Sequence, residues 1–176
     1  MKLDDTAPAV LALHTAAPTA DWPAPSIDEV TLRKVTFAED TDLASRVTVA
    51  ARAIDEFGSP MHVLASGDDG AVAIRLAVTH PELVKSLVLA DATSHTALGD
   101  VTADLTAVTV PALVVCAAPE LNSDLTASQE LAGQISNGVF VVMDRVERPA
   151  HRARPDSFNA WSDSFISIVE GLRGLA

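Results

Sequence analysis

Two side chains that can attack or bind a substrate stand two residues apart, at Ser66 and Asp68. They follow the apolar run Met61 to Ala65, and His95 follows a second run that ends at Ala90. Open parallel sheets bind their ligands beyond the carboxyl ends of the strands, so these residues could meet at one edge. A serine becomes a good nucleophile only when a base takes its proton. Ser66 with His95 would therefore form a dyad of nucleophile and base.

The same residues also have structural interpretations. Most histidines on such loops are merely exposed, and this applies to His95 and to His14, which follows the first apolar run and could otherwise touch a ligand. Asp68 and Asp69 would cap the helix that follows them and favour its dipole. A dinucleotide site at Gly67-x-x-Gly70 is disfavoured, because the two acids inside that motif would repel a pyrophosphate.

The elements that must position these residues follow from the apolar pattern. Short apolar runs alternate with helical periodicity, which is typical of strands joined by crossover helices in a parallel sheet. We predict an α/β fold, a three-layer sandwich with a mostly parallel sheet of about six strands, in a single domain over residues 1–176. Arg33 and Lys34 mark one run as an edge strand. The runs are Ala9 to Leu13, Val30 to Phe37, Met61 to Ala65, Ser86 to Ala90, Ala112 to Cys116 and Val139 to Met143.

Apolar residues at helical spacing predict four helices between and after these strands. The first carries a stripe from Leu43 to Phe57, and the second starts near Asp68 or Asp69 and runs to His80. The third starts near Ser123 or Asp124 and stops at Asn137-Gly138, burying Leu125, Leu131 and Ile135. The last begins at Pro155 and ends near Gly174, with a stripe of Phe158, Trp161, Phe165, Ile168 and Leu172.

Charge and composition exclude several classes of function. The chain has 24 acidic against 12 basic residues and a formal charge of −12, which disfavours binding to nucleic acid or to anionic membranes. We expect a cytoplasmic protein, because no apolar stretch approaches the roughly 20 residues of a membrane span and the N-terminus is acidic where a signal peptide would be basic. The single Cys116 is interpreted as a buried strand residue, with a reactive thiol as the alternative. We expect no metal and no cofactor.

The segment Met61 to Asp91, which reads MHVLASGDDGAVAIRLAVTHPELVKSLVLAD, resembles the α/β-hydrolase family. Members of that family have a strand, a sharp turn of the form G-x-S-x-G, a helix, a His-Pro-Glu-type break and another buried strand. The resemblance extends to Ala9–His14, which is similar to the strand before the oxyanion loop. It extends also to Pro111–Cys116, the strand before the catalytic acid, and to Val139–Phe158, which covers the strand and loop of the catalytic histidine. About 20 residues follow Asp91 before the next strand, too few for the family's lid.

The sequence departs from the family at the positions that the resemblance assigns to the catalytic triad. Gly67 falls at the nucleophile and has no atom with which to attack. Only the displaced Glu120 could serve as the acid, and Arg148, which stays protonated, falls at the base. His14-Thr15-Ala16-Ala17 replaces a glycine-bearing oxyanion loop. A shift of one residue would make Asp68 a nucleophile of the dehalogenase type, but it requires a bulge in the strand.

We therefore predict an α/β-hydrolase-like protein without the Ser-His-Asp triad, a pseudoenzyme that binds a small apolar or acyl ligand or a protein. One alternative is a hydrolase with a relocated site that pairs Ser66 or Asp68 with His95. A third interpretation is a structural subunit that pairs with an intact homologue. The predicted ligand contacts are His14, Thr15, Ser66, Gly67, Asp68, His95 and Arg148.

Three further features have open interpretations. The last apolar run, Val139 to Met143, would be a flat apolar sheet edge, and it predicts a homodimer unless the final helix covers it. His151 and the arginines around it form a basic cluster that either pairs with nearby acids or accepts a carboxylate at the mouth of the site. Trp22 either plugs the loop after the first strand or forms part of a ligand wall.

Overall fold

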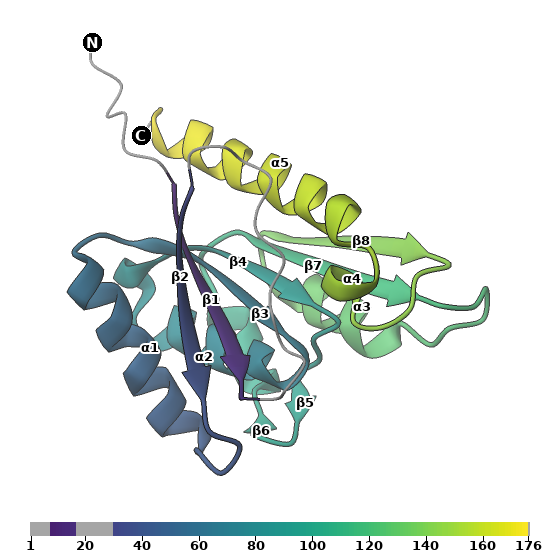
Figure 1. The fold of residues 1–176 in the computed structure, drawn as a ribbon, viewed down its shortest axis with the longest axis horizontal. Coiled ribbons are helices and arrows are strands. Elements are labelled where there is room, and N and C mark those ends of the chain that lie inside the picture. The colour runs from purple at the N-terminus through teal and green to yellow at the C-terminus, as the bar shows by residue number, and fades with distance from the viewer. Residues whose placement is uncertain (1–7, 17–29, 176) are drawn as a thin grey trace.

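The computed structural model describes residues 8–16 and 30–175, and Trp22 lies outside them. Over these residues the main sheet has six parallel strands in the order β2-β1-β3-β4-β7-β8 (Figure 1). All six predicted runs are confirmed as strands. They are β1 (Ala9–Thr15), β2 (Thr31–Phe37), β3 (Met61–Ser66), β4 (Val84–Ala90), β7 (Ala112–Ala118) and β8 (Gly138–Asp144).

Helices cover both faces of this sheet, as the predicted three-layer sandwich requires (Figure 1). On one face lie α1 (Leu43–Phe57), α2 (Gly70–Thr79) and α3 (Thr126–Gln134). On the other lie the short α4 (Ala150–Ala153) and the long α5 (Pro155–Arg173). Each face encloses its own apolar cluster, because residues that alternate along the strands point to opposite sides.

Two helices, α1 and α3, differ in how well their ends follow the sequence pattern. Asp42 caps α1 by accepting a hydrogen bond from the Ser45 amide, and Gly58 ends it in the left-handed conformation with φ +86°. The third helix is shorter than its sequence pattern predicts. Leu125 precedes α3 and is only half-buried, whereas Ile135 follows α3 and is buried.

The edges of the sheet agree with the sequence pattern. β2 forms one edge, its last four residues alternate exposed with buried side chains, and its Arg33 pairs with Glu56 of α1. The strand β8 forms the other edge. Between β4 and β7 the chain makes a small hairpin of β5 (His95–Thr96) and β6 (Gly99–Asp100) and a 3-10 turn at Thr102–Ala107. No helix in the described ranges is long and apolar enough to cross a membrane.

Candidate functional site at the carboxyl ends of the strands

A sharp turn joins β3 to α2, at the place where the resemblance puts the nucleophile. β3 ends at Ser66, Gly67 adopts a positive φ of 53°, and α2 starts at Gly70 after a 3-10 turn at Gly67–Asp69. A Cβ at Gly67 would meet no atom within 4 Å, so the tip of the turn is open. A Cβ at Gly70 would lie 2.7 Å from the Cβ of Ala92, so this glycine allows α2 to approach the loop after β4.

The two aspartates of the turn have different environments. Asp68 is exposed, whereas Asp69 is buried and accepts hydrogen bonds from Arg46 at 2.7 Å and from the Thr15 hydroxyl at 3.0 Å. Asp69 occupies the N-cap position of α2, but its carboxylate forms no capping hydrogen bond, so the predicted capping by this side chain is wrong. The Asp69 carboxylate instead forms a buried, charge-assisted pair with the Arg46 guanidinium.

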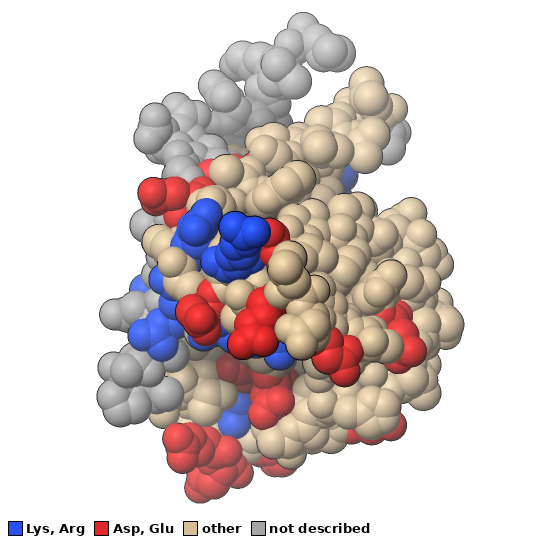
Figure 2. Space-filling view, turned by 90° about the vertical axis from the view of Figure 1, so that its right-hand side faces the viewer, with Lys and Arg blue, Asp and Glu red and all other residues tan. Residues whose placement is uncertain are grey.

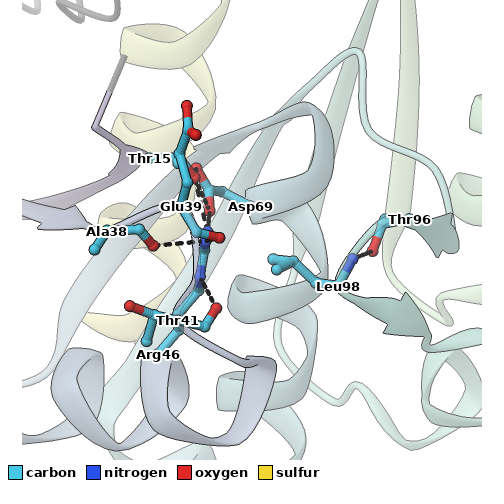
Figure 3. A network of polar contacts seen from close by, with 8 residues as sticks. All are labelled: Thr15, Ala38, Glu39, Thr41, Arg46, Asp69, Thr96 and Leu98. Atoms are coloured by element: carbon cyan, nitrogen blue, oxygen red, sulfur yellow. Dashed lines mark hydrogen bonds and ion pairs between the residues drawn. The ribbon is translucent and has the colours of Figure 1, made fainter.

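Arg46 is the centre of a buried network that joins the end of β1 and the loop after β2 to this turn (Figure 3). Its side chain, which is only 2% exposed, donates to the Thr15 hydroxyl at 2.7 Å and to the Asp69 carboxylate. The same guanidinium donates to the carbonyl oxygens of Ala38, Glu39 and Thr41. Thr15, a predicted ligand contact, therefore has its hydroxyl engaged within the protein.

His14 lies on the side of β1 that adjoins the edge strand. Its Nε2 is 2.9 Å from the hydroxyl of Thr36 in β2, and its buried Nδ1 has no hydrogen-bond partner among the described residues. The turn at Gly67 follows β3, on the opposite side of β1. The imidazole is therefore bonded to β2 and not to Ser66.

His95 lies in the β5–β6 hairpin, where its side chain is largely exposed. Its Nε2 is 3.3 Å from a carboxylate oxygen of Asp100, and its Nδ1 is 3.2 Å from the hydroxyl of Ser94. Within the described ranges, neither Ser66 nor Asp68 forms a hydrogen bond with it. The relocated dyad of the sequence analysis is therefore not assembled in this conformation.

Arg148 and Asp91 together connect the end of β4, the end of β7 and the start of α4, and we call these contacts the Asp91 clamp. The Arg148 guanidinium donates to the carbonyl oxygens of Ala117 at 3.3 Å and of Asp124 at 3.2 Å, and lies 3.8 Å from the Asp91 carboxylate. Asp91 accepts from the amide of Ala117 at 2.8 Å and from that of Ala150 at 2.7 Å. One carboxylate thus ties the end of β4 to the end of β7 and to the start of α4.

The remaining candidates around the site are less connected to it. Glu120 is exposed in the turn after β7, where its amide donates to the Ser123 hydroxyl. Cys116 is a buried residue of β7, as predicted, and burial raises the pKa of its thiol. Seen from the carboxyl ends of β7 and β8, basic and acidic side chains gather in one mixed cluster (Figure 2). In residues 8–16 and 30–175, no three His, Cys, Asp or Glu side chains are grouped to hold a metal ion.

A second group of polar side chains lies at the opposite end of the sheet, and the sequence analysis did not find it. His62 is fully buried between the Ser86 hydroxyl, 2.7 Å from its Nδ1, and Glu170 of α5, 2.8 Å from its Nε2. Lys85 also donates to Glu170, at 2.6 Å. A serine, a histidine and a carboxylate are in hydrogen-bond reach, but the serine is sealed from substrate. This group therefore anchors α5 to the sheet.

Burial shapes the acid–base behaviour of that group. Burial lowers the pKa of His62, although the hydrogen bond to Glu170 opposes this change. Burial also works against ionisation of Glu170, but the hydrogen bonds from Lys85 and His62 outweigh it and hold the pKa of Glu170 below its usual value. The favoured state is a neutral imidazole beside an ionised glutamate.

We expect the stability of the fold to depend on pH through His151, which packs edge-on against Phe158 with 5.8 Å between ring centroids. Burial, with a smaller effect from Arg152, lowers the pKa of His151 from 6.5 to about 4. Between these two pKa values His151 is protonated in the unfolded chain and neutral in the folded one. The free energy of unfolding therefore falls as pH drops from 6.5 toward 4. We expect a loss of about 2 kcal/mol in the free energy of unfolding from pH 7 to pH 5, and urea unfolding at the two pH values measures it.

The matched variants for this titration are His151→Leu and His95→Ala. His151→Leu removes one of the two buried imidazoles and should reduce the pH dependence to the part that His62 contributes, while His95→Ala removes an exposed imidazole and should leave the slope unchanged. If the slope of His151→Leu equals that of the native chain, His151 does not control the pH dependence.

Comparisons with known proteins identify similar folds and no close relative. No family model matches the sequence, and no curated protein matches it either. A thermophilic esterase from Thermogutta terrifontis has a TM-score of 0.75 at 13% identity, over 94% of this chain and 91% of the esterase. A meta-cleavage product hydrolase from Pseudomonas fluorescens has a TM-score of 0.72 at 12% identity, over 96% and 92%. For the 2-hydroxy-6-oxo-6-phenylhexa-2,4-dienoate hydrolase of a Rhodococcus strain, the TM-score is 0.68 at 16% identity, over 88% and 89%.

Proposed function

We propose that this chain, which has the α/β-hydrolase fold, works by binding a ligand and not by hydrolysing one. The observation that carries the proposal is Gly67 at the tip of the turn after β3. Its positive φ of 53° is the backbone geometry of a nucleophile elbow, but glycine has no side chain to attack a carbonyl. The backbone of a hydrolase site thus remains without its reactive atom.

The residues around the elbow support the same conclusion. The position assigned to the general base holds Arg148, whose guanidinium donates to two backbone carbonyl oxygens and stays protonated. Asp91 uses both carboxylate oxygens to hold backbone amides. Thr15 and Asp69 are bound to Arg46. In this proposal, side chains that would act in catalysis or on a substrate hold loops in place instead.

The ligand that we propose is a small molecule with an apolar or acyl part, bound at the open tip of the elbow. Because Gly67 has no side chain and faces free space, a ligand atom can approach its backbone closely. Ser66 is half-buried beside it and supplies a hydroxyl. The other proposed contacts are Asp68 and His95, whose side chains are exposed. Native mass spectrometry of the purified protein would identify such a ligand without assuming an activity.

A fluorophosphonate probe and short-chain activated esters test the proposal against a working hydrolase. We expect no turnover above background and no label on Ser66, because no histidine lies within hydrogen-bond distance of Ser66 among the described residues. A label mapped to Ser66, together with turnover that the probe abolishes, would refute the proposal and establish a relocated site.

Gly67→Ser should fold and remain without esterase activity. The added side chain has room, and its cost is about 1 to 2 kcal/mol for a non-glycine residue at a left-handed φ. The new hydroxyl has no base, and enzymes with a complete site exceed uncatalysed rates by about a millionfold or more. We expect less than about a tenfold difference from the matched control Gly67→Ala, measured as initial rates on an activated acetate ester.

A large rate difference between these two variants would contradict the proposal. If Gly67→Ser exceeded Gly67→Ala by about a thousandfold, a base would have to lie near the elbow. The additional change His95→Ala would then show whether that base is His95.

A further inference from the structure

An apolar groove opens on the α5 face of the molecule, at the amino-terminal ends of β7 and β8. Its volume is about 420 Å³, and its lining includes Leu113, Val139, Trp161, Phe165, Ile168 and Leu172. The elbow at Gly67 follows the carboxyl end of β3, so the groove belongs to the other end of the sheet. We call these six residues the α5 groove. It is separate from the proposed ligand site.

The α5 groove exists because the final helix covers only part of its apolar stripe. Phe158, Ile166 and Val169 of α5 are buried. In contrast, Trp161 is 49% exposed and Ile168 is 62% exposed. The helix α5 thus leaves part of the last strand uncovered, since Val139 of β8 is 47% exposed.

The outer edge of β8 adds unpaired backbone groups to this apolar surface. Among the described residues, β8 pairs only with β7. The carbonyl of Asn137 accepts from the Ala112 amide of β7, so alternation turns the backbone groups of Val139 and Val141 toward β7. Those of Phe140 and Val142 consequently point to the free edge. A strand edge of this kind is a template for another strand.

We propose that a second copy of this chain occupies this surface, with the two β8 strands paired antiparallel about a two-fold axis. With the axis at Val141, Phe140 of one copy faces Val142 of the other, and each such pair can exchange both backbone hydrogen bonds. An axis perpendicular to the sheet keeps the two α5 helices on the same face, beside each other. The contact is self-complementary and closes at two subunits.

Charge argues for a second copy as the occupant. Each chain has a formal charge of −12, so copies repel wherever their acidic surfaces meet. No residue that lines the groove is charged, although Asn137 and Ser164 of its lining are polar, and β8 has no charged residue from Gly138 to Met143. Two copies can therefore meet here without bringing acids together.

Interface size indicates that the groove and the strand edge act together. A stable dimer buries about 800 Å² per partner, roughly a tenth of the 8,991 Å² surface of this chain. The edge of a seven-residue strand, about 23 Å long, is too narrow to supply this area by itself. The exposed side chains of α5 supply the remaining apolar surface, and a central tryptophan is a typical hot spot of such an interface.

Light scattering after size exclusion tests the proposal at tens of micromolar protein. We expect the native chain to have twice the 18.4 kDa mass of the monomer. Trp161→Glu places a charge in the α5 groove and should raise the dimer dissociation constant at least tenfold. Val142→Pro removes an outward amide and should have the same effect. The matched control is Val49→Glu, because Val49 of α1 is 46% exposed and lies outside the surface.

Each outcome decides one part of the proposal. A native chain that is a monomer at this concentration overturns it. If Trp161→Glu remains a dimer as tight as the native one, the groove is not part of the interface. A Val142→Pro variant that melts cooperatively and still dimerises excludes β8 pairing, and if this variant does not fold, Trp161→Glu remains decisive. None of these readouts depends on esterase activity or on a ligand at the elbow.

Discussion

Arg46→Met should lower the free energy of unfolding by about 3 to 5 kcal/mol, measured by urea denaturation. The methionine keeps the apolar stem of the arginine but removes its guanidinium. Asp69 then remains buried with only the Thr15 hydroxyl as a side-chain donor. The carbonyl oxygens of Glu39 and Thr41 also lose the donor that Arg46 supplies. An uncompensated buried carboxylate is the main cost, because its charge is no longer balanced.

A matched control on the same helix is Arg52→Met. Arg52 pairs with Glu56 in an exposed i,i+4 arrangement, so its loss should change stability by less than about 0.5 kcal/mol. The double variant Arg46→Met/Asp69→Leu removes both buried charges and should recover much of the loss. A loss below about 1 kcal/mol for Arg46→Met would show that the pair does not support the fold.

Asp91→Ala should cost about 2 to 4 kcal/mol, the second largest effect that we expect. The amides of Ala117 and Ala150 would both lose their acceptor, and each partly buried amide without a partner costs about 1 to 3 kcal/mol. Asp91 also has a positive φ of 50°, which aspartate tolerates better than alanine. Urea denaturation measures the loss.

Two variants separate the causes of this effect. Asp91→Asn keeps the tolerance of a positive φ and one carbonyl oxygen, so its stability should lie between those of the native protein and Asp91→Ala. Asp100→Ala removes an exposed aspartate that accepts from a single backbone amide, that of Thr102. If Asp91→Ala is no more destabilising than Asp100→Ala, the Asp91 clamp is not important for stability.

The alternation of apolar runs and amphipathic stripes was sufficient to predict the α/β fold and all six strands. This signal is local, because burial on both faces or on one helix face imprints a period on neighbouring residues. The edge position of β2 could also be predicted, since Arg33 and Lys34 are incompatible with a strand buried on both sides.

The polar networks could not be predicted, because their partners are far apart in the sequence. His62 and Glu170 are 108 residues apart, and no local pattern relates them. One signal for Arg46 was present, since it falls between Leu43 and Ala50 at helical spacing and therefore on the buried stripe of α1. A buried arginine requires a carboxylate partner, but the sequence does not say which of the nearby acids provides it.

The sequence also could not show how α5 divides its apolar stripe between the sheet and the α5 groove. The spacing of Phe158, Trp161 and Phe165 predicts a single apolar face. Which part of that face is covered depends on the path of the helix across the strands. The roles proposed for Ser66, Gly67 and Arg148 likewise rest on the geometry of loops, where side-chain periodicity gives no information.

The position of α5 as the last element described affects how the fold forms during synthesis. One face of the central strands is covered by α5, and the ribosome makes this helix last among the elements described. The strands from β1 to β8 therefore emerge, and can begin to pair, while that apolar face is still open. Nascent chains with such exposed surface are prone to aggregate. The residues of α5 thus determine when the newly made sheet is protected, in addition to how stable it is afterwards.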